Sequence, residues 1–101
     1  MFGLEKLFAN KTDFKKLVNE GAVILDVRTP GEFAEGHIKG AVNVPVDQLR
    51  HSLVELKNKN KTIITCCLSG ARSAIAANLL KNADVSAVNG GSWQSLSKKI
   101  A

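Results

Sequence analysis

Two short apolar segments constrain the fold of this chain more than any other feature of its sequence. Residues 22–27 (Ala-Val-Ile-Leu-Asp-Val) and residues 62–66 (Thr-Ile-Ile-Thr-Cys) are almost free of charge and rich in β-branched side chains. Such runs are typical of strands that are buried on both faces of a parallel sheet. Parallel strands are joined by crossovers, usually helices, so the chain is expected to alternate strands with helices.

The rest of the chain carries the helix and turn signals that this pattern requires. Helices are expected over residues 13–18, 32–35, 47–57 and 72–81 and after Gly91, and further strands over residues 40–45 and 85–88. Together these elements predict an α/β fold with a mainly parallel sheet and helices on both faces. A chain of 101 residues usually carries one core, so residues 1–101 are expected to form a single domain.

Three of these helices carry more specific expectations. Thr12 and Asp47 are placed to cap the helices that follow them. In the helix expected over residues 72–81, the apolar stripe predicted to face the core consists of Ile75, Leu79 and Leu80.

Composition and charge exclude several classes of function. The chain is 45% hydrophobic, but no apolar run reaches the roughly 18 residues that span a bilayer. The first eight residues lack the pattern of a signal peptide, so the protein is expected to be cytoplasmic and to have no membrane partner. The net charge of +5 is concentrated in residues 57–101, which hold seven Lys or Arg against one acidic residue (+6), whereas residues 1–56 carry −1. Five aromatic residues, not interleaved with the basic ones, argue against a nucleic-acid partner.

The two cysteines, Cys66 and Cys67, are adjacent. Adjacent cysteines close only a strained ring, which indicates free thiols in a reducing compartment rather than a structural disulfide. Strand alternation directs the two side chains to opposite faces of the sheet. Cys66 is therefore interpreted as a packing residue, and so is Trp93 near the end of the chain.

The segment after Cys67 is suited to holding an anion. It consists of small or flexible residues that lead into the expected helix: Leu68, Ser69, Gly70, Ala71 and Arg72. A tight loop at a helix start directs several backbone N–H groups inward, where they stabilise negative charge. With Arg72 nearby, these donors should lower the pKa of the Cys67 thiol. The pattern predicts a cysteine nucleophile that acts on a small anionic substrate.

Three motifs in order resemble those of rhodanese domains. Residues 67–73 (Cys-Leu-Ser-Gly-Ala-Arg-Ser) resemble the active-site loop, and residues 25–45 and 89–93 resemble the N-terminal and C-terminal signatures of the family. The resemblance covers about residues 12–97. The chain is therefore identified as a member of the rhodanese-like family, although it lacks the Gly-x-Pro ending of many members.

The resemblance implies a thiosulfate sulfurtransferase. Cys67 would take sulfane sulfur from a donor such as thiosulfate, carry it as a persulfide and pass it to cyanide or a thiol. The N–H groups of residues 68–72 would hold the transferred sulfur, and Arg72 would orient the anionic donor. No cofactor or metal is implied, and His37 and His51 lack the spacing of metal ligands.

The resemblance leaves other functions open. Rhodanese-like domains also serve as binding modules, which typically lack the cysteine, or as persulfide carriers for a partner protein that donates or accepts sulfur. A cysteine-dependent phosphatase or arsenate reductase is less favoured. Phosphatases have five residues between cysteine and arginine, whereas this chain has four between Cys67 and Arg72.

Four residues are expected to support the site. Asp26 and Arg28 lie at the end of the first apolar run, at the same sheet edge as the cysteine loop. Asp26 is expected to bind the loop amides, and Arg28 to pair with Glu32. His37 is interpreted as a hydrogen-bonded architectural residue, because a stabilised thiolate needs no general base. Ser73 is expected to donate a hydrogen bond to the loop.

Overall fold

The chain folds around a four-stranded parallel sheet. The computed structural model describes residues 12–101, and its strand order is β2-β1-β3-β4 with every pair parallel. The expected α/β fold class is therefore confirmed. The two apolar runs of the sequence form the central strands β1 and β3. The strand bounds are β1 Val23–Asp26, β2 Val42–Asn43, β3 Ile63–Cys67 and β4 Ala87–Ser92.

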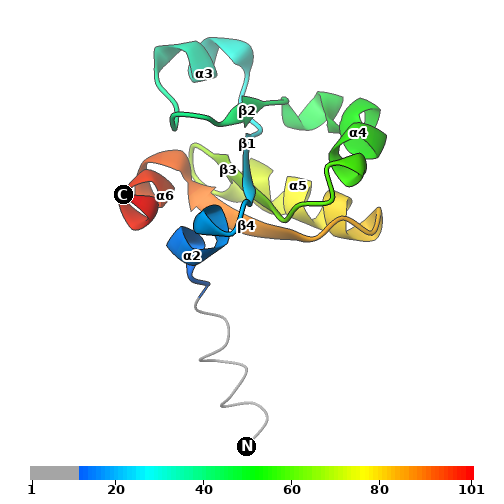
Figure 1. Cartoon of the computed structure of the whole chain (residues 1–101). Helices are drawn as coiled ribbons and strands as arrows, with labels where there is room; N and C mark the ends of the chain where they lie inside the picture. Colours follow the sequence, from blue (N-terminus) through cyan, green and yellow to red (C-terminus); the bar gives the residue numbers. More distant parts are fainter. Residues whose placement is uncertain (1–11) are drawn as a thin grey trace, which may run out of the picture.

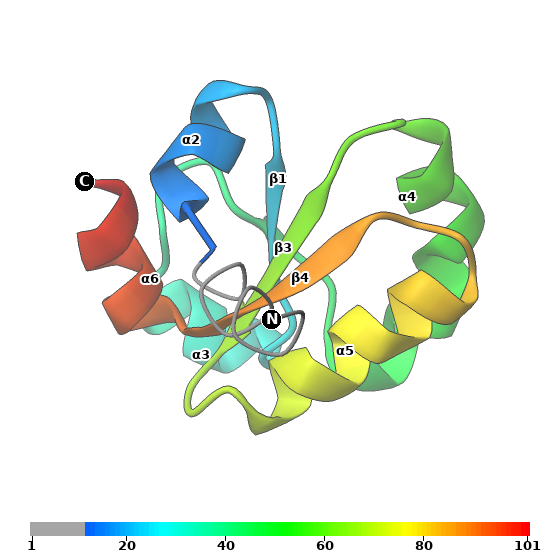
Figure 2. The same ribbon diagram turned by 90° about the horizontal axis from the view of Figure 1, so that it is seen from below.

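Helices cover both faces of the sheet, as Figures 1 and 2 show. α2 and α6 lie on one face, and α4 and α5 lie on the other. α3 follows β1 and lies at the carboxyl end of the sheet. The helix bounds are α2 Phe14–Asn19, α3 Pro30–Glu35, the 3₁₀ helix η1 Val46–Ser52, α4 Leu53–Asn58, α5 Ala71–Asn82 and α6 Trp93–Ile100.

Alternation along the two central strands divides the core into two clusters. Leu25, Ile63 and Cys67 face the cluster that α4 and α5 complete. Ile24, Ile64 and Cys66 face the cluster that α2 and α6 complete, which Trp93 joins as a partly buried member. Each fully buried Leu or Ile contributes about 1.5–3 kcal/mol. The strands are therefore specified by burial on both faces, as the apolar runs predicted.

Helix α5 confirms part of the expected stripe, because Leu80 is fully buried and Leu79 packs against the core, but Ile75 does not face the core. Ile75 is 59% exposed, whereas Ser73, Ala76, Ala77 and Leu80 are buried. Small side chains let the helix backbone approach the sheet closely, so alanines occupy the contact and the larger Ile75 points outward.

Three boundaries also differ from the expectations. Asp13 rather than Thr12 caps α2, with its carboxylate accepting from the N–H of Lys16 at 3.1 Å. The segment expected to be one helix over 47–57 begins as the 3₁₀ helix η1, which follows Pro45 and has no side-chain cap. The last strand, β4, starts later than predicted and runs to Ser92. No helix within residues 12–101 is long and apolar enough to cross a membrane.

Candidate functional site

The site forms where β3 ends and α5 begins, at the carboxyl end of the sheet. Cys67 is the last residue of β3, and Ala71 is the first residue of α5. Between them Gly70 adopts φ +102°, a left-handed conformation that side-chain-bearing residues rarely adopt. This turn directs the N–H of Gly70 back toward the strand, where it donates to Cys67 Sγ at 3.0 Å.

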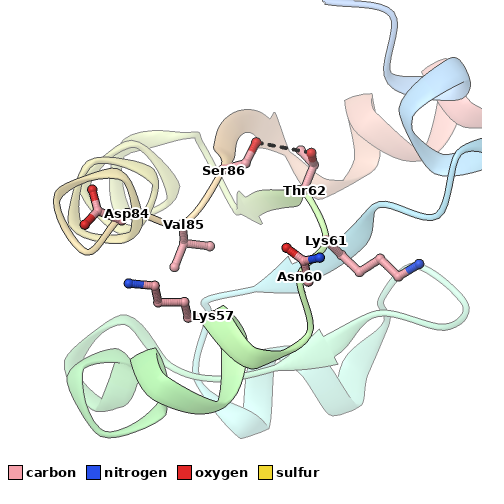
Figure 3. Close-up of a pocket in the computed structure, with 7 residues that line it drawn as sticks. All are labelled: Lys57, Asn60, Lys61, Thr62, Asp84, Val85 and Ser86. Carbon is pink, nitrogen blue, oxygen red and sulfur yellow. Dashed lines mark hydrogen bonds between the residues drawn. The ribbon is translucent and has the colours of Figure 1, made fainter.

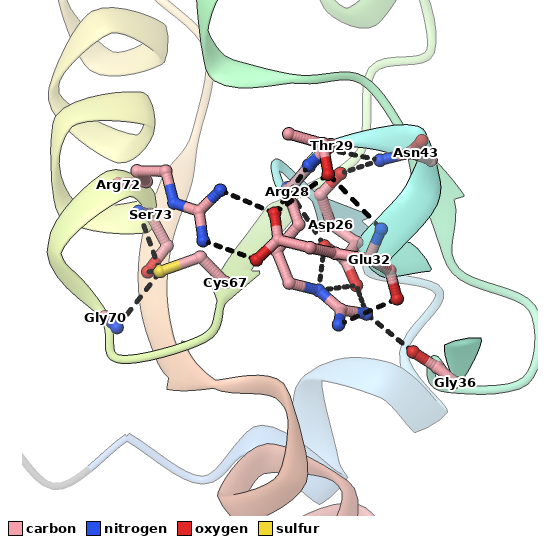
Figure 4. A network of polar contacts seen from close by, with 10 residues as sticks. All are labelled: Asp26, Arg28, Thr29, Glu32, Gly36, Asn43, Cys67, Gly70, Arg72 and Ser73. Atoms are coloured by element: carbon pink, nitrogen blue, oxygen red, sulfur yellow. Dashed lines mark hydrogen bonds and ion pairs between the residues drawn. The ribbon is translucent and has the colours of Figure 1, made fainter. Parts of the chain in front are cut away.

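The sulfur of Cys67 is surrounded by hydrogen-bonding groups (Figure 4). Besides Gly70, the N–H of Ser73 donates to it at 3.4 Å, and the thiol contacts Ser73 Oγ at 3.4 Å. Burial raises the pKa of Cys67, but hydrogen bonds from the Ser73 hydroxyl and from the N–H groups of Ser73, Gly70 and Ser69 outweigh it and lower the pKa below its ordinary value. The expected donors for a thiolate are therefore present.

Each remaining loop residue has a distinct position. Leu68 is 56% exposed at the surface of the loop. Ser69 contributes its backbone N–H toward the sulfur, while its side chain is exposed. Cys67 itself is fully buried.

A polar residue of β4 supports the loop and was missed by the sequence reasoning. Asn89 Oδ1 accepts from the Ser73 hydroxyl at 2.7 Å and from the N–H of Gly91 at 2.9 Å. Its Nδ2 donates to the carbonyl of Gly70 at 3.2 Å. Asn89 thus binds Ser73 and Gly70, the two residues whose N–H groups donate to the sulfur at 3.4 and 3.0 Å. Asn89 begins the 89–93 motif of the family, and this position in the sequence could have indicated that Asn89 supports the site.

Arg72 is held by an acidic residue of α3. Its two terminal guanidinium nitrogens donate to Glu32 Oε1 at 2.8 Å and Oε2 at 3.0 Å. The hydrogen bond with Arg72 is the main cause that lowers the pKa of Glu32 to about 2. Glu32 also completes a capping box with Thr29 at the start of α3, which orients its carboxylate toward the loop.

Arg28 and Asp26 form a separate, buried ion pair. Arg28 Nη2 donates to Asp26 Oδ2 at 2.7 Å, and Arg28 Nε donates to Asp26 Oδ1 at 2.9 Å. Arg28 also donates to the carbonyls of Gly36 at 2.7 Å and Glu32 at 3.2 Å, and its guanidinium lies 4.8 Å from the ring centroid of Trp93. This network connects β1, α3 and α6.

Two expectations about these residues were wrong. Arg28 contacts the backbone of Glu32, and the Glu32 carboxylate pairs with Arg72 instead. Within residues 12–101, Asp26 directs its carboxylate to Arg28 and not to the amides of the cysteine loop. Arg28 had two acidic residues nearby in sequence and binds the carboxylate of Asp26 rather than that of Glu32. The partner of the Glu32 carboxylate, Arg72, lies far away in sequence.

His37 follows α3 and has an architectural contact, as expected. Its Nδ1 lies 2.7 Å from the carbonyl of Phe33, and its ring stacks on that of Phe33 with centroids 3.7 Å apart. These contacts fix the turn that leaves α3.

Cys66 is as buried as Cys67, but it packs on the other face of the sheet and its pKa is shifted in the opposite direction. Its side chain lies in the cluster on the opposite face of the sheet, and both thiols are free. Burial, followed by the nearby charge of Asp26, raises the pKa of Cys66 to about 12. The interpretation of Cys66 as a packing residue agrees with this environment.

One hollow of the described surface lies away from this site. It lies between Lys57, Lys61, Asp84 and their neighbours, at the amino ends of β3 and β4 (Figure 3). The five residues of β3 place it about 15 Å from Cys67, at about 3.3 Å per residue. Residues 12–101 also contain no cluster of three or more His, Cys, Asp or Glu side chains that could hold a metal ion.

The fold and the loop together define a class of protein, in which a parallel α/β sheet presents a thiol within a ring of backbone amides. A comparison with family models matches residues 10–96 to the Rhodanese-like domain. The chain belongs to the rhodanese-like domain family, whose named relatives include sulfurtransferases.

Curated relatives match at modest identity. The chain is 40% identical over 60 residues to the uncharacterized protein YqhL of Bacillus subtilis, covering 59% of this chain and 47% of that protein. It is 38% identical over 74 residues to the putative sulfur carrier protein YrkF of the same organism, covering 73% and 37%. It is 31% identical over 90 residues to the thiosulfate sulfurtransferase GlpE of Stutzerimonas stutzeri, covering 79% and 83%. The chain thus spans less than half the length of YqhL and YrkF.

Solved structures match over most of the chain. A rhodanese-related protein from Thermoplasma volcanium superposes with a TM-score of 0.70 at 31% identity, covering 79% of this chain and 80% of that chain. A human single-domain sulfurtransferase superposes with a TM-score of 0.70 at 25% identity, covering 86% and 91%. The sheet and helices described above are therefore those of a rhodanese fold.

Proposed function

We propose that this protein is a sulfurtransferase that carries sulfane sulfur as a persulfide on Cys67. The observation that carries the proposal is the set of polar groups around Cys67 Sγ: the N–H of Gly70 donates to it at 3.0 Å and the N–H of Ser73 at 3.4 Å, and the Ser73 hydroxyl lies 3.4 Å away. Such donors stabilise a thiolate, and they can stabilise the terminal negative sulfur of a persulfide in the same way.

The proposed reaction has two half-reactions that balance without a cofactor. The Cys67 thiolate attacks the outer sulfur of thiosulfate, so a new S–S bond forms while the S–S bond of thiosulfate breaks. Sulfite leaves with the bonding electron pair, and the enzyme holds a persulfide anion. Cyanide or a thiolate then attacks the terminal sulfur of the persulfide, which breaks the enzyme's S–S bond and regenerates the Cys67 thiolate.

The partners in this proposal are a small anionic sulfur donor and a small thiophilic acceptor. A relative with 31% identity is named a thiosulfate sulfurtransferase, which supports thiosulfate as the reference donor. We propose that residues 68–72 surround the transferred sulfur and that Arg72 meets the donor. The free, adjacent cysteines suit a reducing compartment, so we propose a cytoplasmic location.

A persulfide carrier that serves a partner protein is the second candidate. Leu68 is 56% exposed on the loop next to Cys67, and an apolar side chain there suits a protein surface better than a small anion. The match to the putative sulfur carrier protein YrkF supports the same role. The sulfurtransferase and the carrier use the same Cys67 persulfide. They differ in how fast the persulfide transfers its sulfur to a small acceptor such as cyanide.

Cysteine variants test the proposal through thiocyanate formation from thiosulfate and cyanide. We expect Cys67→Ser to abolish turnover and Cys66→Ser to retain most of it, because Cys66 lies on the opposite face of the sheet with a raised pKa. Equal loss in both variants would indicate a dithiol mechanism and contradict the proposal. A native protein that forms the persulfide but passes sulfur only to a partner protein would identify the carrier.

A further inference from the structure

Arg72 is the cation of the cysteine loop, and its guanidinium is already bound. Both terminal nitrogens donate to the Glu32 carboxylate, at 2.8 and 3.0 Å. The pair is partly open to solvent, with side chains 34% and 30% exposed. In Figure 4 the two groups face each other beside Cys67. A bidentate pair of this kind uses the same two N–H groups that would grip an anionic donor.

The position of Glu32 is built into the fold. The Glu32 carboxylate accepts from the N–H of Thr29 at 3.0 Å, and the backbone carbonyl of Glu32 accepts from the buried Arg28. These contacts hold α3 so that the Glu32 carboxylate lies beside the cysteine loop. We propose that this loop binds anions, so a negative charge is placed next to an anion-binding site. A dianion that approaches Arg72 must displace this carboxylate and is also repelled by it. A donor with less negative charge meets less of both effects.

We infer that Glu32 is a specificity-determining residue that biases the site against dianionic donors such as thiosulfate and toward sulfane sulfur donors of lower charge, such as an alkyl persulfide. The inference rests on the proposed sulfurtransferase function. Glu32 exerts its effect through the charge of Arg72 and through direct repulsion of the donor, and it takes no part in bond making.

Two sulfur donors that react by the same chemistry but differ in charge allow the effect of donor charge on the rate to be measured. Thiosulfate carries two negative charges and releases sulfite, whereas methanethiosulfonate carries one and releases methanesulfinate. In each case the Cys67 thiolate bonds to the outer sulfur, and the leaving group departs with the electron pair of the broken S–S bond. Cyanide accepts the sulfur in both assays, so only the donor half-reaction differs.

The informative variant is Glu32→Gln. Glutamine removes the charge but retains an oxygen for the capping box with Thr29, so α3 should remain in place. The matched control is Glu35→Gln, which makes the same change of charge on an exposed residue of the same helix. Glu35 forms no ion pair among the described residues.

We expect Glu32→Gln to raise kcat/KM for thiosulfate by about fivefold and for methanethiosulfonate by about twofold, mainly through KM. The gain should shrink as ionic strength rises, because salt screens exposed charges. Glu35→Gln should change neither donor appreciably. An equal change for both donors, or a loss of thiosulfate activity in Glu32→Gln, would overturn the inference.

Sulfate provides a readout that does not depend on turnover. It has the charge and approximate shape of thiosulfate but no sulfane sulfur, and it should protect Cys67 from alkylation by iodoacetamide. We expect the half-protecting sulfate concentration to fall about fivefold in Glu32→Gln. An unchanged concentration would overturn the inference even if neither donor supports turnover. Absence of sulfur transfer in native protein together with the expected shift in protection would instead contradict the proposed function alone.

Discussion

Ser73→Ala tests how the loop lowers the pKa of Cys67. The hydroxyl of Ser73 lies 3.4 Å from Cys67 Sγ, while the backbone N–H groups of Ser73 and Gly70 remain in the variant. A hydrogen bond to a charged group contributes about 1.5–3 kcal/mol. The lower end applies here because the Ser73 hydroxyl donates its proton to Asn89 Oδ1 at 2.7 Å and would have to share it with the thiolate. This value corresponds to about a tenfold smaller thiolate population.

The assay is the rate of Cys67 alkylation by iodoacetamide as a function of pH. On the acidic limb of the profile, Ser73→Ala should react about tenfold more slowly than native protein, because less thiolate is present. At high pH, where the thiol is fully ionised, the variant should react at least as fast, because a more basic thiolate is more nucleophilic. Cys66 should remain silent throughout, since burial raises its pKa to about 12.

Ser69→Ala is the matched control for this experiment. It removes a hydroxyl from the same loop but keeps the N–H that helps to lower the pKa of Cys67. It also reports any general effect of a loop substitution on access to the buried thiol. A Ser73→Ala profile that is slower at every pH, or that matches native protein, would refute the role assigned to the hydroxyl.

Three further predictions concern stability. Arg28→Met leaves the buried Asp26 carboxylate without its ion-pair partner, so urea denaturation should show a free energy of unfolding lower by about 3–5 kcal/mol. The control Arg50→Met, at an exposed position, should change the free energy of unfolding by less than about 0.5 kcal/mol. Gly90→Ala places a Cβ 2.8 Å from a core methyl group and 2.8 Å from a backbone carbonyl, so it should cost about 1–3 kcal/mol, whereas Gly31→Ala meets no atom within 4 Å and should be tolerated. The pKa of Glu32 is lowered from 4.5 to about 2, so its ion pair with Arg72 should stabilise the fold above pH 4.5 and lose that effect as the pH falls toward 2. In acid unfolding, Glu32→Gln should therefore lose less stability than native protein between pH 4.5 and 2.

The strands and the cysteine loop were predictable because their signals are local. Ile24 and Leu25 belong to a run that is buried on both faces, and such runs are visible without knowledge of the partner strands. The role of Cys67 was predicted from the small residues 69–71 that follow it and lead into a helix. The pattern that predicts a strand–loop–helix junction therefore also predicts the place of the thiol.

The polar partners were not predictable because they depend on tertiary placement. Arg72 and Glu32 are 40 residues apart, and nothing local indicates that α3 directs its carboxylate to the loop. Asn89 reaches Ser73 only because β4 pairs with β3. On α5, Leu80 does lie on the buried face, but Ile75 was assigned wrongly, because it is more hydrophobic than the neighbouring alanines whereas close packing on the sheet favours the smaller side chains.

The central claim is that Cys67 carries the sulfur, and intact mass spectrometry of the protein after incubation with a sulfane sulfur donor tests it most directly. Native protein should gain the mass of one sulfur atom, peptide analysis should place it on Cys67, and a cyanide chase should remove it with release of thiocyanate. Cys67→Ser should gain nothing under the same conditions, while Cys66→Ser should behave like native protein. A native protein that gains no mass from thiosulfate or from methanethiosulfonate, or a sulfur found on Cys66, would contradict the account.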